Sequence, residues 1–354
     1  MQKELIYNLS LSALTDLLKS WGEPAYRSRQ VWNGLYQSLW SKPEEFSNIP
    51  KSLRQKLLNH LSFSHLTPAT TLDSTDGETQ KTLFRLPDNR PIETVRMRYA
   101  NRRTLCISTQ SGCAMGCVFC ATGQMGFLRN LTAGEIIEQV LYYSRQLATQ
   151  GERVTNVVFM GMGEPFQNYD NVLSTIHRLN DSESMNFGAR RFTISTVGLI
   201  PAIQRFTAER SQVNLAVSLH AANDELRSSM LPVNKKYPLN KLMAALREYA
   251  QVTKRRITFE WALIQGVNDS PEQAYQLAGL LHGMLAHVNV IPLNPTAGFQ
   301  GKGSTSKNAK QFQSILESKG IPCTIRIRRG IDIHAGCGQL ASKDTKILPH
   351  FSNP

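Results

Sequence analysis

From Thr104 onward, the sequence alternates between short segments typical of β-strands and longer segments typical of helices, and this alternation limits the fold more than any other feature. Because successive β/α units need parallel strands with helices covering them, the pattern predicts either a doubly wound sheet or a barrel. A closed eight-unit barrel needs about 250 residues, so an open, TIM-like partial barrel of six units, a (β/α)6 core in the α/β class, fits residues 104–340 better. The strand-like segments are rich in β-branched residues and cover residues 104–109, 154–161, 190–198, 213–220, 255–264 and 287–294.

Two helical segments of this region carry start signals. Thr132 and Glu135 have the spacing of a capping box ahead of an apolar run. Ser270 followed by Pro271 is typical of the first turn of a helix. Both signals support the alternation of strands with helices.

The first hundred residues follow different patterns. Apolar residues recur at helical spacing in 11–21, 31–39 and 53–61, which predicts a small N-terminal helical domain over residues 1–68. Residues 69–103 show short alternating runs broken by turn signals, and they predict two or three antiparallel strands, a β-hairpin linker to the core. The tail, residues 341–354, has no motif, and we expect it to be poorly ordered.

The chain is strongly basic. It carries 40 Lys and Arg residues against 27 Asp and Glu, which gives a formal charge of +13. Such an excess favours a polyanionic partner, and nucleic acid is a common one. Basic clusters gather in residues 84–103, 190–191, 254–256 and 326–329. A solvated charged face explains any single cluster equally well.

The sequence shows neither a signal peptide nor a membrane-spanning segment. The amino end has no basic segment followed by a long apolar core, and no stretch approaches about 18 consecutive apolar residues. We therefore expect a cytoplasmic monomer without a membrane partner. Aromatic residues of the helical domain, Tyr26, Trp32, Tyr36 and Trp40, are either core residues or a platform for RNA bases.

The six cysteines are unevenly placed. Cys113, Cys117 and Cys120 lie close together, directly after the first predicted strand of the core. In a reducing compartment, such spacing more often binds a metal or does redox chemistry than forms disulfides. A structural zinc site would need a fourth ligand and usually a second pair, which the neighbouring sequence lacks. Three thiolates in one loop suit a [4Fe-4S] cluster with one open iron, and three chance loop cysteines are the alternative.

The cysteine motif opens a long series of further motifs. CAMGCVFC is followed by ATG, GFLRNLTAGEI, FMGMGEP, FTISTVG, SLHAANDELR, LPVNKKYPL, GVNDS, NPT and GIDIHAGCGQLA. Over nearly the whole chain this set resembles the RlmN/Cfr family of radical S-adenosylmethionine (SAM) RNA methyltransferases.

The resemblance implies two cofactors. Cys113, Cys117 and Cys120 would hold the [4Fe-4S] cluster, and its open iron would bind SAM, two molecules of which are used per turnover. Reduction of the cluster, from a flavodoxin-like electron donor, would cleave SAM to a 5′-deoxyadenosyl radical. Glu164 would take the SAM ammonium group. The other SAM contacts implied by the resemblance also follow predicted strands, although each alone could be a turn or capping residue: Gly163, Ser195, Ser218, Leu219, His220 and Asn294.

The resemblance also implies three catalytic residues. Cys337 would accept a methyl group from SAM and later form a covalent crosslink to RNA, and Cys106 would resolve that crosslink through a transient disulfide. Glu93 would remove the proton from the adenine carbon. On pattern alone, Glu93 is an exposed strand residue and Cys106 a buried one. Cys323 matches no functional position, and we expect it to serve packing.

The implied activity is methylation of adenine C2 in 23S rRNA, at the peptidyl-transferase centre, and in certain tRNAs just 3′ of the anticodon. This ring carbon is not nucleophilic, which suits radical chemistry. A Cfr-like enzyme acting on adenine C8 is the closest alternative. A noncatalytic RNA-binding protein with a structural metal is an alternative of another class.

Overall fold

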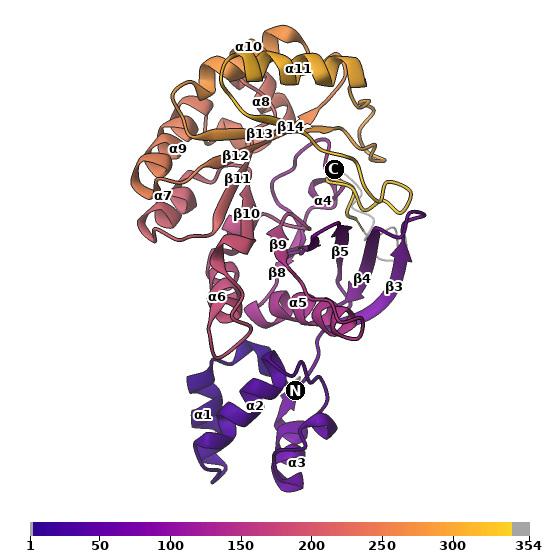
Figure 1. Ribbon diagram of the computed structural model, residues 1–354, viewed down its shortest axis with the longest axis vertical. Coiled ribbons are helices and arrows are strands. Elements are labelled where there is room, and N and C mark those ends of the chain that lie inside the picture. Colours follow the sequence, from indigo (N-terminus) through magenta and orange to yellow (C-terminus); the bar gives the residue numbers. More distant parts are fainter. Residues whose placement is uncertain (1–2, 342–354) are drawn as a thin grey trace, which may run out of the picture.

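The computed structural model describes residues 3–341. Figure 1 shows an elongated molecule with a helical unit at one end and an arc of strands covered by helices at the other. The expectation of a poorly ordered tail concerns residues that, apart from Ala341, lie outside the described part of the chain.

A ten-stranded sheet forms the framework of the molecule, in the order β14-β13-β12-β11-β10-β9-β6-β5-β4-β3. The seven strands that stand between β14 and β6 in this order, both included, all run parallel. They are β6 (Arg102–Cys106), β9 (Asn156–Phe159), β10 (Phe192–Thr196), β11 (Asn214–Ser218), β12 (Ile257–Leu263), β13 (Ala286–Pro292) and β14 (Cys323–Ile325). The edge strands β14 and β3 do not pair, so the predicted open partial barrel is confirmed. The short β14 adds one parallel strand to the six expected.

Helices cover the outer side of the arc (Figure 1). They are α5 (Ala133–Ala148), α6 (Tyr169–Asn180), α7 (Ile200–Ala208), α8 (Asp224–Met230), α9 (Leu239–Thr253), α10 (Pro271–Leu281) and α11 (Ser306–Ser318). Thr132 and Glu135 form the predicted capping box of α5, and the Ser270 hydroxyl accepts from the Gln273 N–H at the start of α10. The apolar strand residues and helix faces share one buried core. Each fully buried Leu, Ile or Phe side chain stabilises the fold by about 1.5–3 kcal/mol.

The antiparallel strands continue the same sheet. They are β3 (Thr67–Asp73), β4 (Thr79–Arg85) and β5 (Pro91–Tyr99), and β5 pairs antiparallel with β6. The prediction of two or three antiparallel strands in this region is therefore confirmed. Because the sheet runs without a break from β3 into the core, the division of the chain at residues 68, 103 and 340 stays a prediction.

The N-terminal unit contains α1 (Leu11–Ser20), α2 (Tyr26–Tyr36) and α3 (Lys51–His60), with a parallel pair β1 (Glu4–Leu5) and β2 (Leu61–Ser62). Its aromatic residues divide in two groups. Trp32 and Tyr36 are buried, and the Trp32 indole donates to the Ser184 hydroxyl at 3.1 Å, so these rings pack the unit against the core. Tyr26 remains exposed.

The remaining elements are short. Strands β7 (Gln110–Gly112) and β8 (Phe127–Asn130) pair antiparallel on either side of α4 (Ala121–Gln124). The 3-10 helices are η1 (Ile6–Asn8), η2 (Pro43–Glu45), η3 (Pro165–Asn168), η4 (Ala189–Arg191) and η5 (Pro232–Lys235). Within residues 3–341, no helix has both the length and the apolar character required to cross a bilayer.

Candidate active site

A single cavity gathers most of the predicted site residues. It lies at the carboxyl ends of the parallel strands, where partial barrels place their functional groups. The predicted residues among those that line it are Cys113, Cys117, Cys120, Gly163, Glu164, Ser195, Ser218, His220, Asn294 and Cys337. Leu219 is fully buried and does not line the cavity. Glu93 and Cys106 do not line it either, and both are buried.

The three clustered cysteines lie on the loop between β7 and β8. Gly112 starts this loop at φ +71°, and a Cβ there would collide with the carbonyl oxygen of Gly126. The Cys113 N–H donates to that same oxygen at 2.9 Å. Glycine is therefore required for the loop to close. Burial raises the pKa of the Cys113 thiol to about 12 and that of Cys117 well above its usual value.

The three thiols of this loop supply the donor set of a [4Fe-4S] cluster with one open iron. Among residues 3–341, no group of three or more His, Cys, Asp or Glu side chains converges to hold a metal ion. Zinc would gather its sulfur ligands around one centre at about 2.3 Å. In a [4Fe-4S] cluster each thiolate binds a different iron, so the sulfurs stand farther apart. The three cysteines all line one cavity, as the ligands of a shared cluster would.

Glu164 is a buried carboxylate at the end of β9 that faces the cavity. Its Oε2 accepts from the Val197 N–H at 2.9 Å, and its Oε1 accepts from the Phe166 N–H at 3.0 Å. Burial raises the pKa of Glu164 to about 7, against the opposing effect of these hydrogen bonds. A carboxylate held in this way is prepared to bind a cation such as an ammonium group.

Gly163 adopts φ +101°, and a Cβ there would lie 2.5 Å from the Gln110 Cβ. The Gln110 amide oxygen accepts from the Glu164 N–H at 2.9 Å. The glycine thus lets β7 approach and orient Glu164, in addition to lining the cavity.

His220 follows β11 in a left-handed conformation, φ +60°. Its Nδ1 accepts from the Ala262 N–H at 2.9 Å, so the neutral ring carries its proton on Nε2. Burial and the nearby Arg227 charge lower the pKa of His220 to about 3, which keeps the ring neutral. The Phe119 ring meets it edge-on with centroids 5.0 Å apart. Nε2 is therefore a hydrogen-bond donor.

Cys337 lies on a C-terminal segment, residues 326–341, that crosses from β14 to the antiparallel strands and back to the cysteine loop. Asp332 accepts from the Thr75 hydroxyl at 2.8 Å, and the Asn294 amide donates to the Cys337 carbonyl at 3.2 Å. At its end, the Leu340 carbonyl accepts from the Thr122 hydroxyl. These contacts hold Cys337 over the cavity.

Cys106 and Cys337 are both free thiols, like the other cysteines of the described chain. Burial raises the pKa of Cys106 to about 12, and the Cys337 charge adds to this while Arg326 opposes it. Burial also raises the pKa of Cys337, again against Arg326. Cys337 is nevertheless exposed, and it lines the cavity. The structure therefore gives this thiol access to solvent rather than a lowered pKa.

The position of Glu93 differs from the strand-pattern expectation. Instead of being exposed, its side chain is buried, and Glu93 Oε1 lies 3.0 Å from Lys81 Nζ. Alternation along β5 could not reveal this, because the C-terminal segment covers the face that would otherwise be open to solvent. Burial raises the pKa of Glu93, and the Lys81 charge lowers it.

Two residues of this region were not predicted. Glu260 on β12 is buried and lines the cavity, and its Oε1 accepts from the Asn289 amide at 3.0 Å. Arg326 lies 3.9 Å from Glu260 and acts on both Cys106 and Cys337. The sequence placed Arg326 only in a basic cluster. Cys323, as expected, is a buried residue of the core.

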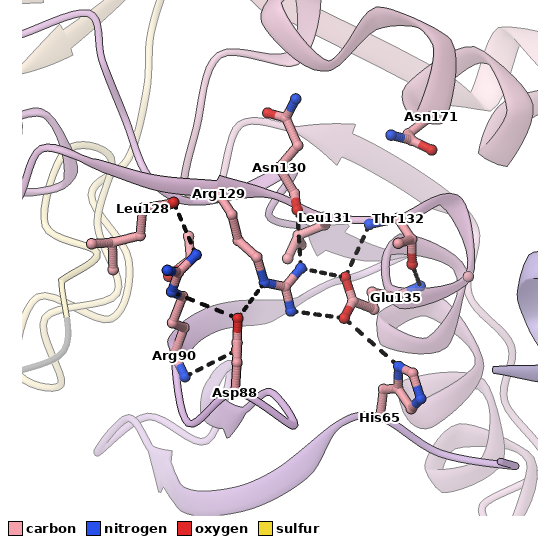
Figure 2. A network of polar contacts seen from close by, with 12 residues as sticks. His65, Asp88, Arg90, Leu128, Arg129, Asn130, Leu131, Thr132, Glu135 and Asn171 are labelled. Carbon is pink, nitrogen blue, oxygen red and sulfur yellow. Dashed lines mark hydrogen bonds and ion pairs between the residues drawn. The ribbon is translucent and has the colours of Figure 1, made fainter. Parts of the chain in front are cut away.

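A polar network joins three parts of the chain (Figure 2). Arg129 of β8 donates to both carboxylate oxygens of Glu135 and to Asp88 in the β4–β5 turn. Glu135 Oε1 also lies 3.8 Å from the His65 ring, which precedes β3. The network thus fastens the cysteine loop to α5 and to the antiparallel strands.

Part of the arginine cluster in residues 84–103 is used inside the protein. Arg98 and Arg103 both pair with Glu152, and Arg96 is buried. Arg102 is exposed and packs on the Tyr99 ring at 4.8 Å, and Arg329 packs on the same ring at 4.6 Å. Only some of these charges are therefore available to a polyanion.

The fold and the cysteine-lined cavity define a radical SAM protein. Residues 107–278 match the radical SAM superfamily, and residues 5–62 match the ribosomal RNA large subunit methyltransferase N-terminal domain. The crystal structure of a radical SAM methyltransferase from Sphaerobacter thermophilus superposes with a TM-score of 0.93 at 49% identity, covering 95% of this chain and 98% of that one.

Curated relatives narrow the family further. A probable dual-specificity RNA methyltransferase RlmN from Chloroflexus aurantiacus is 48% identical over 97% of this chain and 94% of its own. The corresponding protein of Enterococcus faecalis is 45% identical over 98% of both chains. The chain belongs to the RlmN family of radical SAM RNA methyltransferases, and this family implies a [4Fe-4S] cluster and SAM.

Proposed function

We propose that this protein methylates C2 of one adenine in 23S rRNA, at the peptidyl-transferase centre, and C2 of the adenine 3′ of the anticodon in a subset of tRNAs. Relatives named dual-specificity RNA methyltransferases support the two substrates. The observation that carries the proposal is the placement of Cys337 on the cavity of the cysteine loop, with Cys106 close enough for the charge of Cys337 to act on it. A noncatalytic RNA-binding protein has no use for this arrangement.

Cys113, Cys117 and Cys120 would hold the cluster. SAM, bound in the same cavity, would supply both the methyl group and the radical. Glu164 would accept hydrogen bonds from the ammonium group of SAM. The polar side chains of Ser195, Ser218, His220 and Asn294 would bind its other polar groups, and Gly163 and Leu219 would shape the backbone around them. The burial of Glu164 and His220 supports this assignment, because polar groups prepared in a closed site lose little on binding.

The chain itself carries the methyl group. Cys337 would accept it from one SAM by displacement, and a second SAM would supply the radical that removes a hydrogen atom from the S-methyl group. The methyl carbon could then bond to the adenine and join protein and RNA covalently. Glu93 takes the proton from the ring carbon. Cys106 then attacks the sulfur of Cys337, which releases the methylated RNA and leaves a disulfide between the two cysteines to be reduced.

Nucleoside mass spectrometry of RNA treated with the anaerobically reconstituted protein tests the proposal. We expect 2-methyladenosine from 23S rRNA fragments and from tRNA, and none from Cys337→Ala. A main product of 8-methyladenosine would instead establish the Cfr-like activity. A colourless zinc-containing protein without SAM cleavage would establish the noncatalytic alternative.

Three further parts of the proposal concern the oligomeric state, the cellular location and the electron donor of the protein. We propose that the protein acts as a monomer in the cytoplasm and receives electrons from a flavodoxin-like donor. Sedimentation of the loaded protein checks the first point. Replacing dithionite by a reduced flavodoxin in the methylation assay checks the last, since SAM cleavage should continue.

A further inference from the structure

Lys81 is a buried cation that joins two parts of the candidate site. Its ammonium group lies 3.0 Å from Glu93 Oε1 and donates to the His334 carbonyl at 3.1 Å. His334 precedes Cys337 by three residues on the same C-terminal segment. One side chain of β4 therefore contacts both the proposed base and the segment that carries the proposed methyl acceptor.

The register of the sheet explains this position. Lys81 pairs with Val95 on β5, and Val95 pairs with Cys106 on β6, so the three residues form one row across the strands. Residues in such a row share a face of the sheet, and Glu93 lies on that face two residues before Val95. Val95 and Cys106 pack with Leu340 at the end of the C-terminal segment.

Because the ion pair between Lys81 and Glu93 is buried, the charge of Lys81 strongly affects whether Glu93 is ionised. The side chains of Lys81 and Glu93 are exposed by only 9% and 4%. A buried carboxylate without a counter-charge takes up a proton, and a protonated Glu93 cannot act as a base. Within residues 3–341, Lys81 is the charged group that acts on Glu93, and the backbone N–H of Ala341 is its further polar neighbour.

We propose that Lys81 is a positioning residue that keeps Glu93 ionised and fastens the Cys337 segment above it. This rests on the proposed function, in which Glu93 removes the proton from the crosslinked adenine. Lys81 does not touch the reacting atoms. Its role predicts that methylation of Cys337 and formation of the crosslink survive its loss, whereas breakdown of the crosslink slows.

The test uses the reconstituted holoenzyme with Lys81→Met, Lys81→Gln and Lys81→Arg. Without the positive charge the pKa of Glu93 rises, so the base form is present only at higher pH. A rise of about one unit lowers the ionised fraction about tenfold at a pH below both values. We expect the crosslink to persist at neutral pH in Met and Gln variants and to break down as pH rises. The Arg variant should retain the parent profile.

The measurement is the amount of RNA–protein crosslink on denaturing gels over time, at several pH values, together with the S-methyl content of Cys337 from intact mass. Lys56→Met is the matched control, because it removes an ion pair to Glu23 at 2.8 Å in the N-terminal unit. It should leave the lifetime of the crosslink unchanged. If Lys81→Met does not fold, Lys81→Gln decides the matter.

Two results together would overturn the role of Lys81 and leave the role of Glu93 intact. The Met or Gln variant would keep the parent crosslink lifetime and pH profile, while Glu93→Gln would give a stable crosslink. If the Glu93→Gln enzyme releases RNA normally, Glu93 is not the base, and that part of the proposed function is wrong. Thermal unfolding gives a readout that does not depend on turnover: Glu93→Gln should restore the stability that Lys81→Met loses, because it removes the unpaired buried charge.

Discussion

Arg129 donates to both carboxylate oxygens of Glu135, at 2.8 Å each. The same guanidinium reaches Asp88 at 2.7 Å, so one side chain holds β8, α5 and the β4–β5 turn together (Figure 2). Because β8 pairs with β7 and so closes the cysteine loop, the contacts of Arg129 also help to hold the three thiols in position.

Arg129→Met should therefore be strongly destabilising. It leaves Glu135, whose side chain is only 4% exposed, without its main counter-charge. Breaking such a pair from one side costs about 3–5 kcal/mol, and urea denaturation would measure the loss. Arg205→Met is the control: its pair with Asp170 is exposed on both sides, and such pairs contribute at most about 1 kcal/mol. Equal losses of unfolding free energy in the two variants would show that the buried contacts of Arg129 stabilise the fold no more than an exposed ion pair does.

The same carboxylate predicts how stability depends on pH. Burial pushes the pKa of Glu135 upward, but the nearby His65 ring and the hydrogen bonds from Arg129 and the Thr132 N–H outweigh it and hold the pKa at about 2. The folded pKa lies below the ordinary value of 4.5, so the stabilisation is complete above that value and is lost as pH falls toward 2. Denaturation followed from pH 6 to pH 2 should show a shallower acid loss in Glu135→Gln than in the parent.

The strand ends could be predicted from sequence, but the charged interior of the site could not. Glu164, Ser218 and Asn294 follow β-branched runs in the chain, and parallel strands bring their carboxyl ends to one edge. Glu93 and Lys81 sit in alternating strands whose pattern indicates exposure. Their burial depends on the segment around His334, which is 253 residues from Lys81. A local sequence pattern cannot show that a segment so distant along the chain covers these two side chains.

Arg326 was missed for a related reason. An arginine in a run of arginines looks like a solvated charge. Its contact with Glu260 arises only when the last strand closes against β13. Long motifs, in contrast, identified the whole cysteine loop and most of the residues that line the cavity, because those residues are neighbours in sequence or recur at strand ends.

Glu164→Gln should weaken SAM binding without removing the cluster. The amide keeps the shape of the side chain but loses the negative charge that faces an ammonium group, and charge-assisted hydrogen bonds are worth about 1.5–3 kcal/mol. We expect SAM affinity to fall roughly 10- to 100-fold in equilibrium binding to the reconstituted protein, with iron and sulfide content unchanged. Parent-like affinity would mean that another group binds the ammonium.

Cys106→Ala should trap the RNA on the protein. The variant can still load and transfer the methyl carbon through Cys337, but it lacks the thiol that attacks the crosslink sulfur. A denaturing gel should show a protein–RNA species that disappears in the Cys106→Ala/Cys337→Ala double variant. Cys323→Ala is the matched control, since that buried cysteine lies in the core on β14, and it should turn over normally. Methylation without any crosslink in Cys106→Ala would refute the resolving role.

Gly112→Ala should impair the cluster more than the fold. A Cβ at φ +71° is strained, and it collides with the Gly126 carbonyl that accepts from the Cys113 N–H, so the loop has to open. We expect reconstituted protein with less iron per chain and a weaker cluster absorbance, while the far-ultraviolet circular dichroism stays unchanged. Gly279→Ala in α10 is the control, because nothing lies within 4 Å of the added Cβ. That change should stabilise the helix by roughly 0.5–1 kcal/mol and leave iron content alone, whereas full iron loading in Gly112→Ala would show that the cysteine loop tolerates a different closure.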